Sequence, residues 1–316
     1  MNTFPVSTNK KIEALYDRGK MLRAARDFFY QRNIVEVDCP ILTEFAALDS
    51  NIDLMRTEEL RFLHSSPEYG MKRLLTEGIG DIFQLSHVFR KGEMGSRHNP
   101  EFMMAEWYRQ SFLMEEMIDE TADFIRIFLG DLPLTKIGYR EAFIRLVNFD
   151  PKTDSLEKLK SILKSRNAEF EGMESAGSDT LLQFAVLTLI EPQFEENKLT
   201  ALIHFPSSQA ALSQKFTQDG YSVSKRFEIY YGNLELANGY QELSNPIEQE
   251  ERFILENKER QEKGLEPLPY DLKLIQALKK GLPPCSGVAC GFDRLMMIRH
   301  STHSIKDILP FAWHEA

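Results

Sequence analysis

The chain has no long hydrophobic run, because none of its apolar stretches approaches the roughly 20 residues that a membrane-spanning helix needs. The N-terminal segment MNTFPVSTNKKIEAL also lacks the apolar core of a secretory signal. Cysteine is scarce: Cys39, Cys285 and Cys290 form an odd set without framework spacing, which predicts reduced thiols. We therefore expect a cytoplasmic protein that does not associate with a membrane.

Several common catalytic and binding motifs are also missing. The sequence has no P-loop, no G-x-G-x-x-G, no H-E-x-x-H, no G-x-S-x-G and no EF-hand loop. The histidines show no metal-binding spacing, and Cys285 and Cys290 are better explained as small core residues than as zinc ligands. The net charge of −10 argues against a protein whose main task is to hold a nucleic-acid backbone, although it does not exclude a local basic patch.

The remaining pattern indicates a globular α+β protein, since 42% of its residues are hydrophobic. Helical periodicity and start signals predict helices over 10–33, 66–77, 114–129, 156–166, 247–263 and 271–280. Alternating or buried apolar runs predict strands over 34–37, 82–89, 101–108, 201–206, 227–231, 234–237 and 286–292. We expect a mostly antiparallel sheet flanked by helices, in one domain over 1–316 with a helical insertion near 150–198.

The most informative segment is Phe89–Tyr108, FRKGEMGSRHNPEFMMAEWY, in which two apolar runs meet at a polar loop. The loop holds cations that can contact phosphate oxygens, namely Arg90, Lys91, Arg97 and His98. Glu106 and Tyr108 are two residues apart, so both side chains leave the same face of a strand. The segment predicts a hairpin that binds a polyphosphate and offers a carboxylate to an amine; a solvated hairpin with ordinary surface charge explains it about equally well.

A second pattern is Gly291-Phe292-Asp293-Arg294, where a strand of small residues meets a helix. Glycine lets a flat ring or a phosphate approach the backbone. Arg294 in a first helical turn opposes the helix dipole, which points to an anionic partner. Taken alone, the pattern is better explained by Asp293 as a helix cap that forms a salt bridge with Arg294.

Glutamates form a third pattern within FEIYYGNLELANGYQEL, at Glu228, Glu235 and Glu242. Glu235 lies in an otherwise apolar strand, and a buried carboxylate is costly unless it is paired or bound to a metal. Magnesium prefers such oxygen ligands. The alternative is a sheet face that is open to water.

The fourth pattern is SSPEYGMKRLL, over 65–75. Pro67 and Glu68 are typical of a first helical turn, so a helix cap alone explains this segment. The functional interpretation places Ser66 and Glu68 at the amine or carboxylate end of a substrate.

Together and in this order, the segments resemble the catalytic core of class II aminoacyl-tRNA synthetases. The helix and strand that end at Pro40 resemble the first class motif, the arginine hairpin the second, and GFDRLMM the third. RHNPEF, SPEYGMKRLL, ELANGYQEL and GFDRL resemble the lysyl-tRNA synthetase branch. HFPSSQAALSQ and LPPCSGVACGFDRL extend the likeness over nearly the whole chain to a truncated group of that branch, which joins (R)-β-lysine to elongation factor P. Ser66 and Ala289 match this group.

The resemblance implies an ATP-dependent ligase that activates (R)-β-lysine as an adenylate and transfers it to a lysine of elongation factor P. It implies a homodimer and Mg²⁺, and neither an anticodon-binding domain nor tRNA as a partner. ATP contacts are implied for Arg90, Lys91, Gly92, Glu93, Asn99, Glu235, Leu236, Gly291 and Arg294, with Arg90 and Arg294 as the catalytic cations. Substrate contacts are implied for Ser66, Pro67, Glu68, Glu106, Tyr108, Glu242 and Ala289, and Mg²⁺ ligation for Glu228 and Glu235.

Two positions depart from the pattern of the truncated group. At Arg97 this group tends to have tyrosine, whereas lysyl-tRNA synthetases have arginine. The second motif usually has a glutamate two residues after its arginine, and here that position is Gly92, followed by Glu93. Either Glu93 takes over after a local change of the backbone, or a contact with ATP is lost. Two alternatives therefore stay open: an enzyme that forms a lysyl adenylate for another acceptor, and a non-catalytic sensor of an amino acid or a nucleotide.

Overall fold

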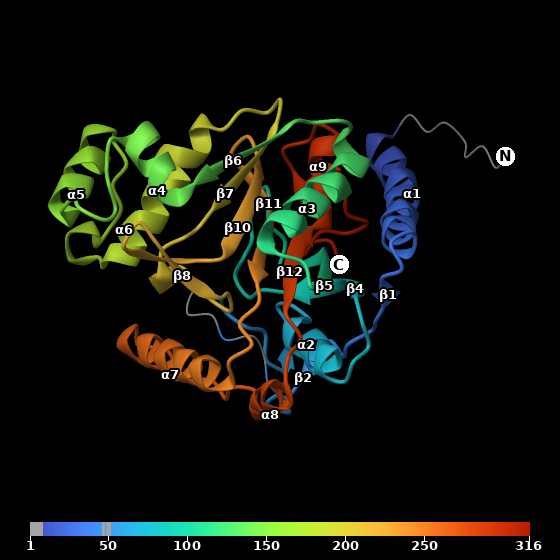
Figure 1. Cartoon of the computed structure of the whole chain (residues 1–316). Coiled ribbons are helices and arrows are strands. Elements are labelled where there is room, and N and C mark those ends of the chain that lie inside the picture. Colours follow the sequence, from blue (N-terminus) through green and yellow to red (C-terminus); the bar gives the residue numbers. More distant parts are fainter. Residues whose placement is uncertain (1–8, 46–47, 49–51) are drawn as a thin grey trace. The chain divides into compact units, whose positions relative to one another are not determined.

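The structure is a computed structural model that describes residues 9–45, 48 and 52–316. The chain divides into two compact units (Figure 1). Unit 1 comprises Met1–Gly130 and Glu242–Ala316, and unit 2 comprises Asp131–Gln241. The predicted single domain and the predicted insertion near 150–198 stay predictions, because this division by compactness tests neither.

Unit 1 is built on four strands in the order β1, β4, β5 and β12. Their bounds are Val35–Glu36, Ile82–Phe89, Glu101–Gln110 and Cys285–Gly291; a separate pair is formed by β2 (Leu42–Thr43) and β3 (Phe62–Leu63). β1 runs parallel to β4, and the other neighbours are antiparallel. The helices are α1 (Lys10–Tyr30), α2 (Glu68–Thr76), α3 (Met114–Leu129), α7 (Pro246–Glu262), α8 (Leu272–Lys280) and α9 (Phe292–Arg299), with a 3₁₀ turn at Ile305–Asp307.

β5 separates the core of unit 1 from its candidate site, because successive side chains of a strand point to opposite faces. Trp107 is completely buried, and its ring centroid lies 5.2 Å from those of Phe29 on α1 and Phe124 on α3. Glu106 and Tyr108 must therefore lie on the face of the sheet that is turned away from these helices. The packing of Trp107 into the aromatic core thus fixes the direction in which Glu106 and Tyr108 point.

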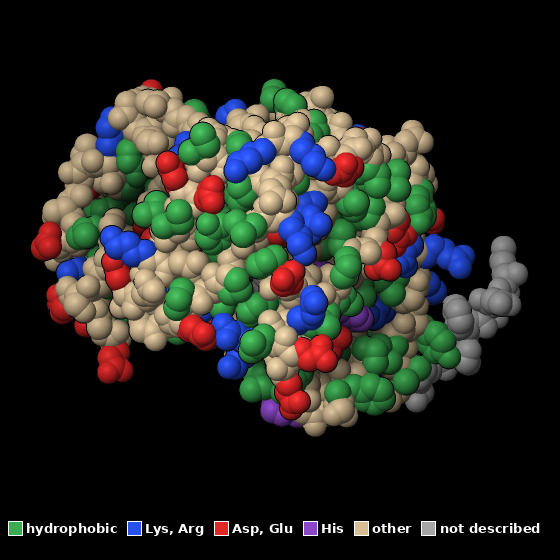
Figure 2. Space-filling view, turned by 90° about the horizontal axis from the view of Figure 1, so that it is seen from below, with side chains coloured by type: hydrophobic (Ala, Val, Ile, Leu, Met, Phe, Trp, Pro, Cys, Tyr) green, Lys and Arg blue, Asp and Glu red, His purple; other side chains and the backbone are tan. Residues whose placement is uncertain are grey.

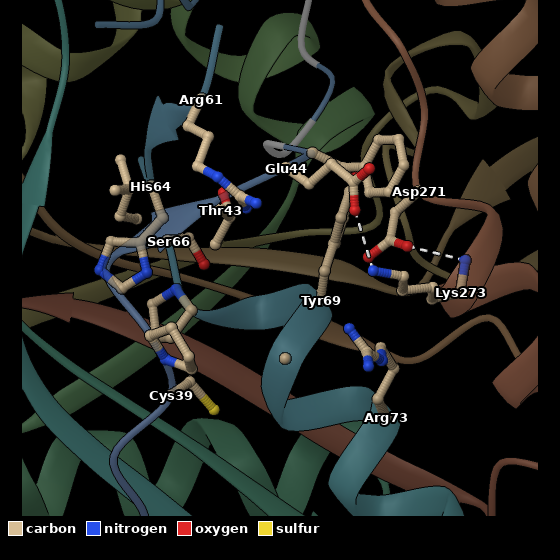
Figure 3. A pocket seen from close by; sticks show the side chains of 15 residues that line it. Cys39, Thr43, Glu44, Arg61, His64, Ser66, Tyr69, Arg73, Asp271 and Lys273 are labelled. Atoms are coloured by element: carbon tan, nitrogen blue, oxygen red, sulfur yellow. Dashed lines mark hydrogen bonds and ion pairs between the residues drawn. The ribbon is translucent and has the colours of Figure 1, made fainter. Parts of the chain in front are cut away.

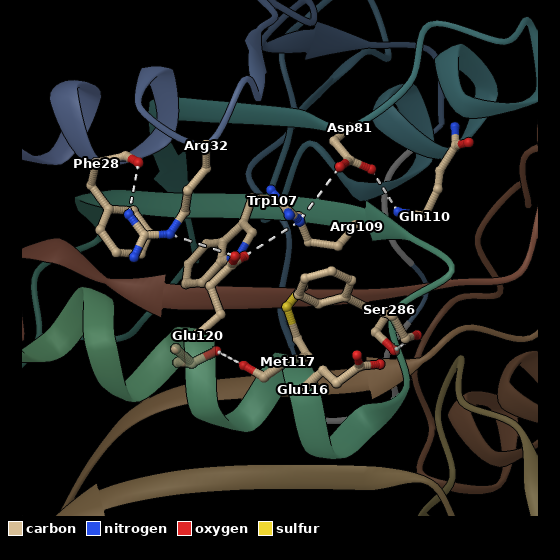
Figure 4. Close-up of polar contacts among 12 residues, drawn as sticks. Phe28, Arg32, Asp81, Trp107, Arg109, Gln110, Glu116, Met117, Glu120 and Ser286 are labelled. Carbon is tan, nitrogen blue, oxygen red and sulfur yellow. Dashed lines mark hydrogen bonds and ion pairs between the residues drawn. The ribbon is translucent and has the colours of Figure 1, made fainter.

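A polar network anchors the core side of β5 (Figure 4). The Glu120 carboxylate, 8% exposed, accepts a hydrogen bond from Trp107 Nε1 at 3.1 Å and lies 3.7 Å from the guanidinium groups of both Arg32 and Arg109. Arg109 Nε lies 3.5 Å from Asp81, which also accepts from the backbone N–H of Gln110. Burial raises the pKa of Glu120, and the charge of Arg109 opposes this. The network connects Arg32, which follows α1, and Glu120 on α3 to the C-terminal end of β5.

Unit 2 has four strands in the order β11, β10, β7 and β6, with bounds Leu234–Gln241, Arg226–Tyr231, Leu199–Ile203 and Leu134–Gly138. β8 (Lys215–Gln218) and β9 (Tyr221–Ser224) form a separate hairpin. The helices are α4 (Tyr139–Ala142), α5 (Leu156–Ser165) and α6 (Ser178–Ala185), with π-helical turns at Phe143–Val147 and Val186–Ile190 and 3₁₀ turns at Met173–Ser175, Glu191–Gln193 and Ser207–Gln209. A buried apolar cluster that includes Phe143, Leu159 and Ile190 holds these helices to the strands.

The predicted α+β class and both predicted hairpins are confirmed. β4 pairs with β5, and β10 pairs with β11 around Gly232, whose φ of +53° suits a tight turn. The predicted helices are present with ends shifted by a few residues, and Cys285 and Cys290 are buried. Within the described ranges, no helix is long and apolar enough to cross a membrane.

The helical period of the apolar residues in α1 predicts one core face that contains Ile12, Leu15, Tyr16, Leu22, Ala25 and Phe29, and this prediction was wrong in part. Ile12 and Tyr16 are 40% and 36% exposed, whereas Ala14, Arg18 and Met21 are buried. The error has a physical cause: α1 buries Arg18 as a partner of Asp293, which an apolar periodicity cannot detect.

Candidate active site

The register between β5 and β12 leaves space beside two polar side chains. Ala289 is the Cα partner of Glu106, and Gly287 is that of Tyr108. Paired residues on neighbouring antiparallel strands point to the same face. The small residues of β12 therefore lie on the face that carries Glu106 and Tyr108.

Three carboxyl groups meet on this face: Glu68, Glu106 and Glu242, hereafter the carboxylate cluster. Glu106 accepts hydrogen bonds from Ser66 Oγ at 2.7 Å and from Tyr108 Oη at 2.8 Å. Ser66 Oγ also accepts from the backbone N–H of Glu68 at 3.0 Å, which starts α2. One hydroxyl thus connects the first turn of α2, whose N-cap residue is Pro67, with the buried Glu106. A substrate contact by Ser66 stays a prediction.

One ammonium lies within the carboxylate cluster. Lys72 Nζ is 2.6 Å from Glu68 Oε1 and 2.6 Å from Glu242 Oε2. Glu106, Tyr108 and Glu242 are at most 3% exposed, while Ser66, Glu68 and Ala289 are half-buried. A ligand would therefore reach the carboxylate cluster past Ser66, Glu68 and Ala289.

Burial and mutual charge perturb the groups of the cluster. Burial, with the charge of Glu68, raises the pKa of Glu106 to about 8. Burial likewise raises the pKa of Glu242, against the opposing charge of Lys72. Burial alone would lower the pKa of Lys72, but Glu242 and Glu68 outweigh it and hold that pKa above its usual value. Three carboxyl groups thus share one ammonium, an arrangement that can accept further positive charge.

Glu106 is expected to make folding stability depend on pH. Its pKa is about 8 in the folded protein against 4.5 for the ordinary group, so between these values the folded state holds a proton that the unfolded state has lost. Stability then falls as the pH rises through this window, by at most about 1.4 kcal/mol per pH unit for one group. Thermal unfolding between about pH 5 and about pH 8 should show a steeper fall for the wild type than for Glu106→Gln.

The matched control for this experiment is Glu250→Gln. Glu250 also accepts a tyrosine hydroxyl, that of Tyr270 at 3.1 Å, but this pair lies near the surface. Its pH profile should follow that of the wild type. Parallel profiles for Glu106→Gln and the wild type would contradict the titration of Glu106.

The hairpin loop places Arg90 and Glu93 together. Arg90 Nη1 lies 3.6 Å from Glu93 Oε1, and the Arg90 guanidinium stacks over the ring of Phe102 at 5.2 Å. Arg90 Nε is buried without a hydrogen-bond partner among the described residues. Gly92 has a φ of +80°, a left-handed conformation that favours glycine. The replacement of the missing glutamate by Glu93, and with it a nucleotide contact by Glu93, stays a prediction.

Asn99 and Lys91 differ in their surroundings. Asn99 is 8% exposed; its amide donates to the Glu101 carbonyl at 2.7 Å and its oxygen accepts from the Trp313 N–H at 2.9 Å. The Asn99 side chain thus fixes the C-terminal segment to the hairpin. Lys91 is exposed, and its backbone N–H donates to the Asp53 carbonyl. ATP contacts by both residues stay predictions.

The start of α9 corrects one explanation from the sequence. Asp293 does not cap the helix; it binds the buried Arg18 and accepts from the Met103 N–H at 2.8 Å. Arg294 Nη2 lies 2.9 Å from His98 Nε2. Arginine can only donate, so His98 Nε2 accepts. Burial, together with the charge of Arg294, lowers the pKa of His98, which keeps this acceptor neutral.

Arg294 therefore joins α9 to the loop of the arginine hairpin. Gly291, from which α9 begins, is the Cα partner of Met104 on β5. The second and third motifs of the sequence thus meet in unit 1, whereas Glu235 and Leu236 belong to β11 of unit 2.

The predicted metal ligands lie on adjacent strands of unit 2. Glu228 is 7% exposed; it accepts from Arg226 Nη2 at 2.5 Å and from the Tyr230 hydroxyl. This burial excludes the interpretation of Glu228 as part of a water-facing surface. Glu235 is half-buried and is the Cα partner of Tyr230. Among the residues that the structure describes, no group of three or more His, Cys, Asp or Glu side chains is placed to hold a metal ion.

A pocket of about 180 Å³ adjoins the carboxylate cluster on the side of Ser66 and Pro67 (Figure 3). Arg61 and Arg73 contribute guanidinium groups to its lining, and Cys39 contributes a thiol. Burial raises the pKa of Cys39 to about 11, so this thiol is not a nucleophile at neutral pH. The pocket borders the proposed site of the amino acid without sharing Glu106 or Tyr108.

The face shown in Figure 2 carries Lys and Arg side chains interspersed with Asp and Glu. Binding of a nucleic-acid backbone uses a continuous basic surface. The net charge of −10 argues against such a surface as the main feature of this protein, and the expectation that tRNA is not a partner stays a prediction.

Two residues that contact the carboxylate cluster, Lys72 and Gly287, were not identified from the sequence. Lys72 was read only as part of a helix, although its i,i+4 spacing from Glu68 was a signal for a salt bridge. Gly287 was read only as a small residue of a strand. A Cβ there would lie 2.3 Å from Tyr108 Cε1 and 2.5 Å from Glu242 Oε1, a closeness that no sequence pattern reveals.

Comparison with known proteins identifies the class of fold and site. A family model of tRNA synthetases class II (D, K and N) matches residues 3–315. The chain therefore belongs to the class II tRNA synthetase family, as the motifs predicted, and membership of this family implies the use of ATP.

The similar curated proteins agree with one another. The elongation factor P–(R)-β-lysine ligase of Pasteurella multocida (strain Pm70) is 41% identical over 314 residues, which cover 96% of this chain and 96% of that protein. The protein of the same name from Haemophilus influenzae (strain PittGG) is 42% identical over 310 residues, which cover 95% of each chain. These relatives match the truncated group that the sequence resembles.

Proposed function

We propose that this protein is an ATP-dependent ligase that activates (R)-β-lysine as an aminoacyl adenylate and transfers it to a lysine side chain of elongation factor P. The relatives from Pasteurella multocida and Haemophilus influenzae support this reaction through their names and their identity of 41% and 42% over nearly the whole chain. The observation in the structure that carries the proposal is the carboxylate cluster with its single ammonium.

The carboxylate cluster is suited to a diamino acid. Glu106, Tyr108 and Glu242 would receive the distal ammonium, and Ser66, Pro67 and Glu68 would frame the amino-acid head. A buried carboxylate needs a cationic partner, and Lys72 alone does not balance both Glu68 and Glu242, while burial keeps a proton on Glu106 at neutral pH that a bound ammonium would displace. The ammonium groups of the substrate would supply the missing positive charge.

Ser66 and Ala289 both adjoin Glu106, by a hydrogen bond of 2.7 Å and by strand register. Lysyl-tRNA synthetases usually have smaller residues at these positions. We therefore propose that the surroundings of Glu106 favour (R)-β-lysine over α-lysine.

The adenylation step needs positioning and charge compensation more than acid–base chemistry. The carboxylate of the amino acid is already a nucleophile at neutral pH; its oxygen attacks the α-phosphorus in line, and pyrophosphate leaves. Arg90 would hold the α-phosphate and Arg294 the γ-phosphate side, each offsetting negative charge that develops. The remaining ATP contacts proposed are those of Lys91, Gly92, Glu93, Asn99, Glu235, Leu236 and Gly291.

Glu228 and Glu235 would hold Mg²⁺. Their hard carboxylate oxygens fit this ion, which usually takes one or two carboxylates and completes its shell with phosphates and water. When bound, Mg²⁺ supplies neutralisation of phosphate charge. Arg226 and Tyr230 fix the orientation of Glu228 through its two oxygens.

The adenylate would then be attacked by a lysine amine of elongation factor P, which forms an amide and releases AMP. We place this reaction in the cytoplasm and propose no role for tRNA. We also propose a homodimer, because α1 and β1, the first class motif, expose the apolar groups of Ile12, Tyr16, Tyr30 and Val35 by 36–51%.

The test compares pyrophosphate exchange with (R)-β-lysine and α-lysine, followed by labelling of elongation factor P and of tRNA. We expect faster exchange with (R)-β-lysine and label on elongation factor P. Charging of tRNA without labelling of elongation factor P would contradict the proposal. Binding of ATP without exchange would favour the sensor instead.

A further inference from the structure

Lys72 is a buried cation that the proposed reaction does not use directly. It lies on α2 and is 1% exposed, yet it is charged, because two carboxylates hold its pKa above the usual value. Its Nζ bridges Glu68 Oε1 and Glu242 Oε2, at 2.6 Å each. Burial of an ammonium is costly, and an apolar side chain of similar length would fill this space at lower cost.

The two carboxylates that Lys72 joins come from different parts of unit 1. Glu68 is the first residue of α2, whereas Glu242 is joined to the sheet by its backbone N–H, which donates to the Cys285 carbonyl of β12 at 3.0 Å. Gly287, also on β12, lets Glu242 lie against the backbone. The Lys72 ammonium thus links the helix to the sheet at the carboxylate cluster, in addition to the Ser66 hydroxyl.

We propose that Lys72 is a positioning residue of the amino-acid site: it fixes Glu68 and Glu242 so that both can bind the ammonium groups of one diamino-acid substrate. This inference rests on the proposed function. Lys72 itself would not bind the ammonium groups of the substrate, since its Nζ is also a cation that can only donate hydrogen bonds and already contacts Glu68 and Glu242. It acts by holding the distance and the orientation between the head and the distal end of the site.

The test is Lys72→Met, which keeps the length of the side chain and removes its charge. We expect the KM for the amino acid in pyrophosphate exchange to rise at least about 10-fold, while the KM for ATP stays within about two-fold, because Lys72 acts only through Glu68 and Glu242. The matched control is Lys158→Met. Lys158 forms an i,i+4 pair with Asp154, also at 2.6 Å, but on the surface of unit 2. This control should leave both KM values unchanged.

An unaltered KM for the amino acid in folded Lys72→Met would overturn the proposal. An equal rise in both KM values would do so too, since that pattern indicates a general effect on the fold. Failure of the proposed function looks different: the wild type itself would show no exchange that depends on the amino acid.

Two further measurements keep the proposal testable if Lys72→Met does not fold or if the wild type shows no exchange activity. Lys72→Met can be combined with Glu242→Gln, which removes the carboxylate that would otherwise be left charged without its partner. We expect this double variant to have a KM for the amino acid at least about three-fold above that of Glu242→Gln alone, because Glu68 also loses its contact with Lys72. Equal KM values in the two variants would refute the role of Lys72. Thermal stabilisation by (R)-β-lysine or α-lysine, which needs no turnover, should be lost in the same variants and kept in Lys158→Met.

Discussion

Arg294→Ala is expected to lower the rate of adenylation, measured as pyrophosphate exchange, by at least about 100-fold, or roughly 2.7 kcal/mol in activation free energy. The proposed reaction builds negative charge on the polyphosphate, and Arg294 is one of two arginines assigned to it. Arg294 is half-buried and reaches back from α9 to His98 in the arginine hairpin, at 2.9 Å. A truncation therefore removes a cation at the place where the second and third motifs meet.

The fold should tolerate this substitution, since the contacts of Asp293 with Arg18 and with the Met103 N–H, which hold this turn, stay in place. Circular dichroism and the unfolding midpoint of Arg294→Ala should stay close to those of the wild type. The control is Arg299→Ala on the same helix, which removes a guanidinium that binds Asp17 and the Phe128 carbonyl. Arg299→Ala should lower the free energy of unfolding and leave the adenylation rate per folded molecule unchanged. An active Arg294→Ala would show that the third motif was misassigned.

Gly287→Ala is expected to abolish tight binding of the amino acid, with a rise in its KM of about 10-fold or more and little change for ATP. The added methyl would lie 2.3 Å from Tyr108 Cε1 and 2.5 Å from Glu242 Oε1, distances that force both side chains to move. Overpacking of this kind typically costs about 1–3 kcal/mol. Because β12 pairs with β5 at this position, the strand itself cannot yield without loss of register.

The effect should be confined to the amino-acid end of the site, which separate titrations of amino acid and ATP in the exchange assay would show. Gly177→Ala makes the same chemical change where no heavy atom lies within 4 Å of the new Cβ. Its kinetic constants should match those of the wild type. A Gly287→Ala protein with a normal KM for the amino acid would mean that Tyr108 and Glu242 do not form the amine site.

Much of the fold followed from local signals. The two hairpins were predictable because apolar runs flank turn residues, and α3 was predictable over Met114–Leu129 from its periodicity. Glu106 and Tyr108 were expected on one face, and their hydrogen bond of 2.8 Å confirms this. The family followed from the order of its motifs, and the match over residues 3–315 confirms it.

Long-range contacts were not predictable in the same way. Arg18 and Asp293 are 275 positions apart in the chain, so no local pattern relates them, and both α1 and the start of α9 were misread for that reason. Lys72 and Glu242 are likewise joined only by the packing of α2 against the sheet. Roles that depend on a bound nucleotide, such as those of Lys91 and Asn99, stay predictions.

The sequence by itself determined the class of the protein and the chemical types at its site, because strand periodicity and turn residues are local properties of short segments, and the order of the motifs can be read along the chain without any knowledge of their contacts. Only the tertiary structure decided which charges meet. It placed Lys72 between Glu68 and Glu242, Ser66 and Ala289 beside Glu106, and Asp293 on Arg18. Charge pairing and burial depend on distances between residues remote in the chain, and these distances exist only after the helices have packed on the sheet.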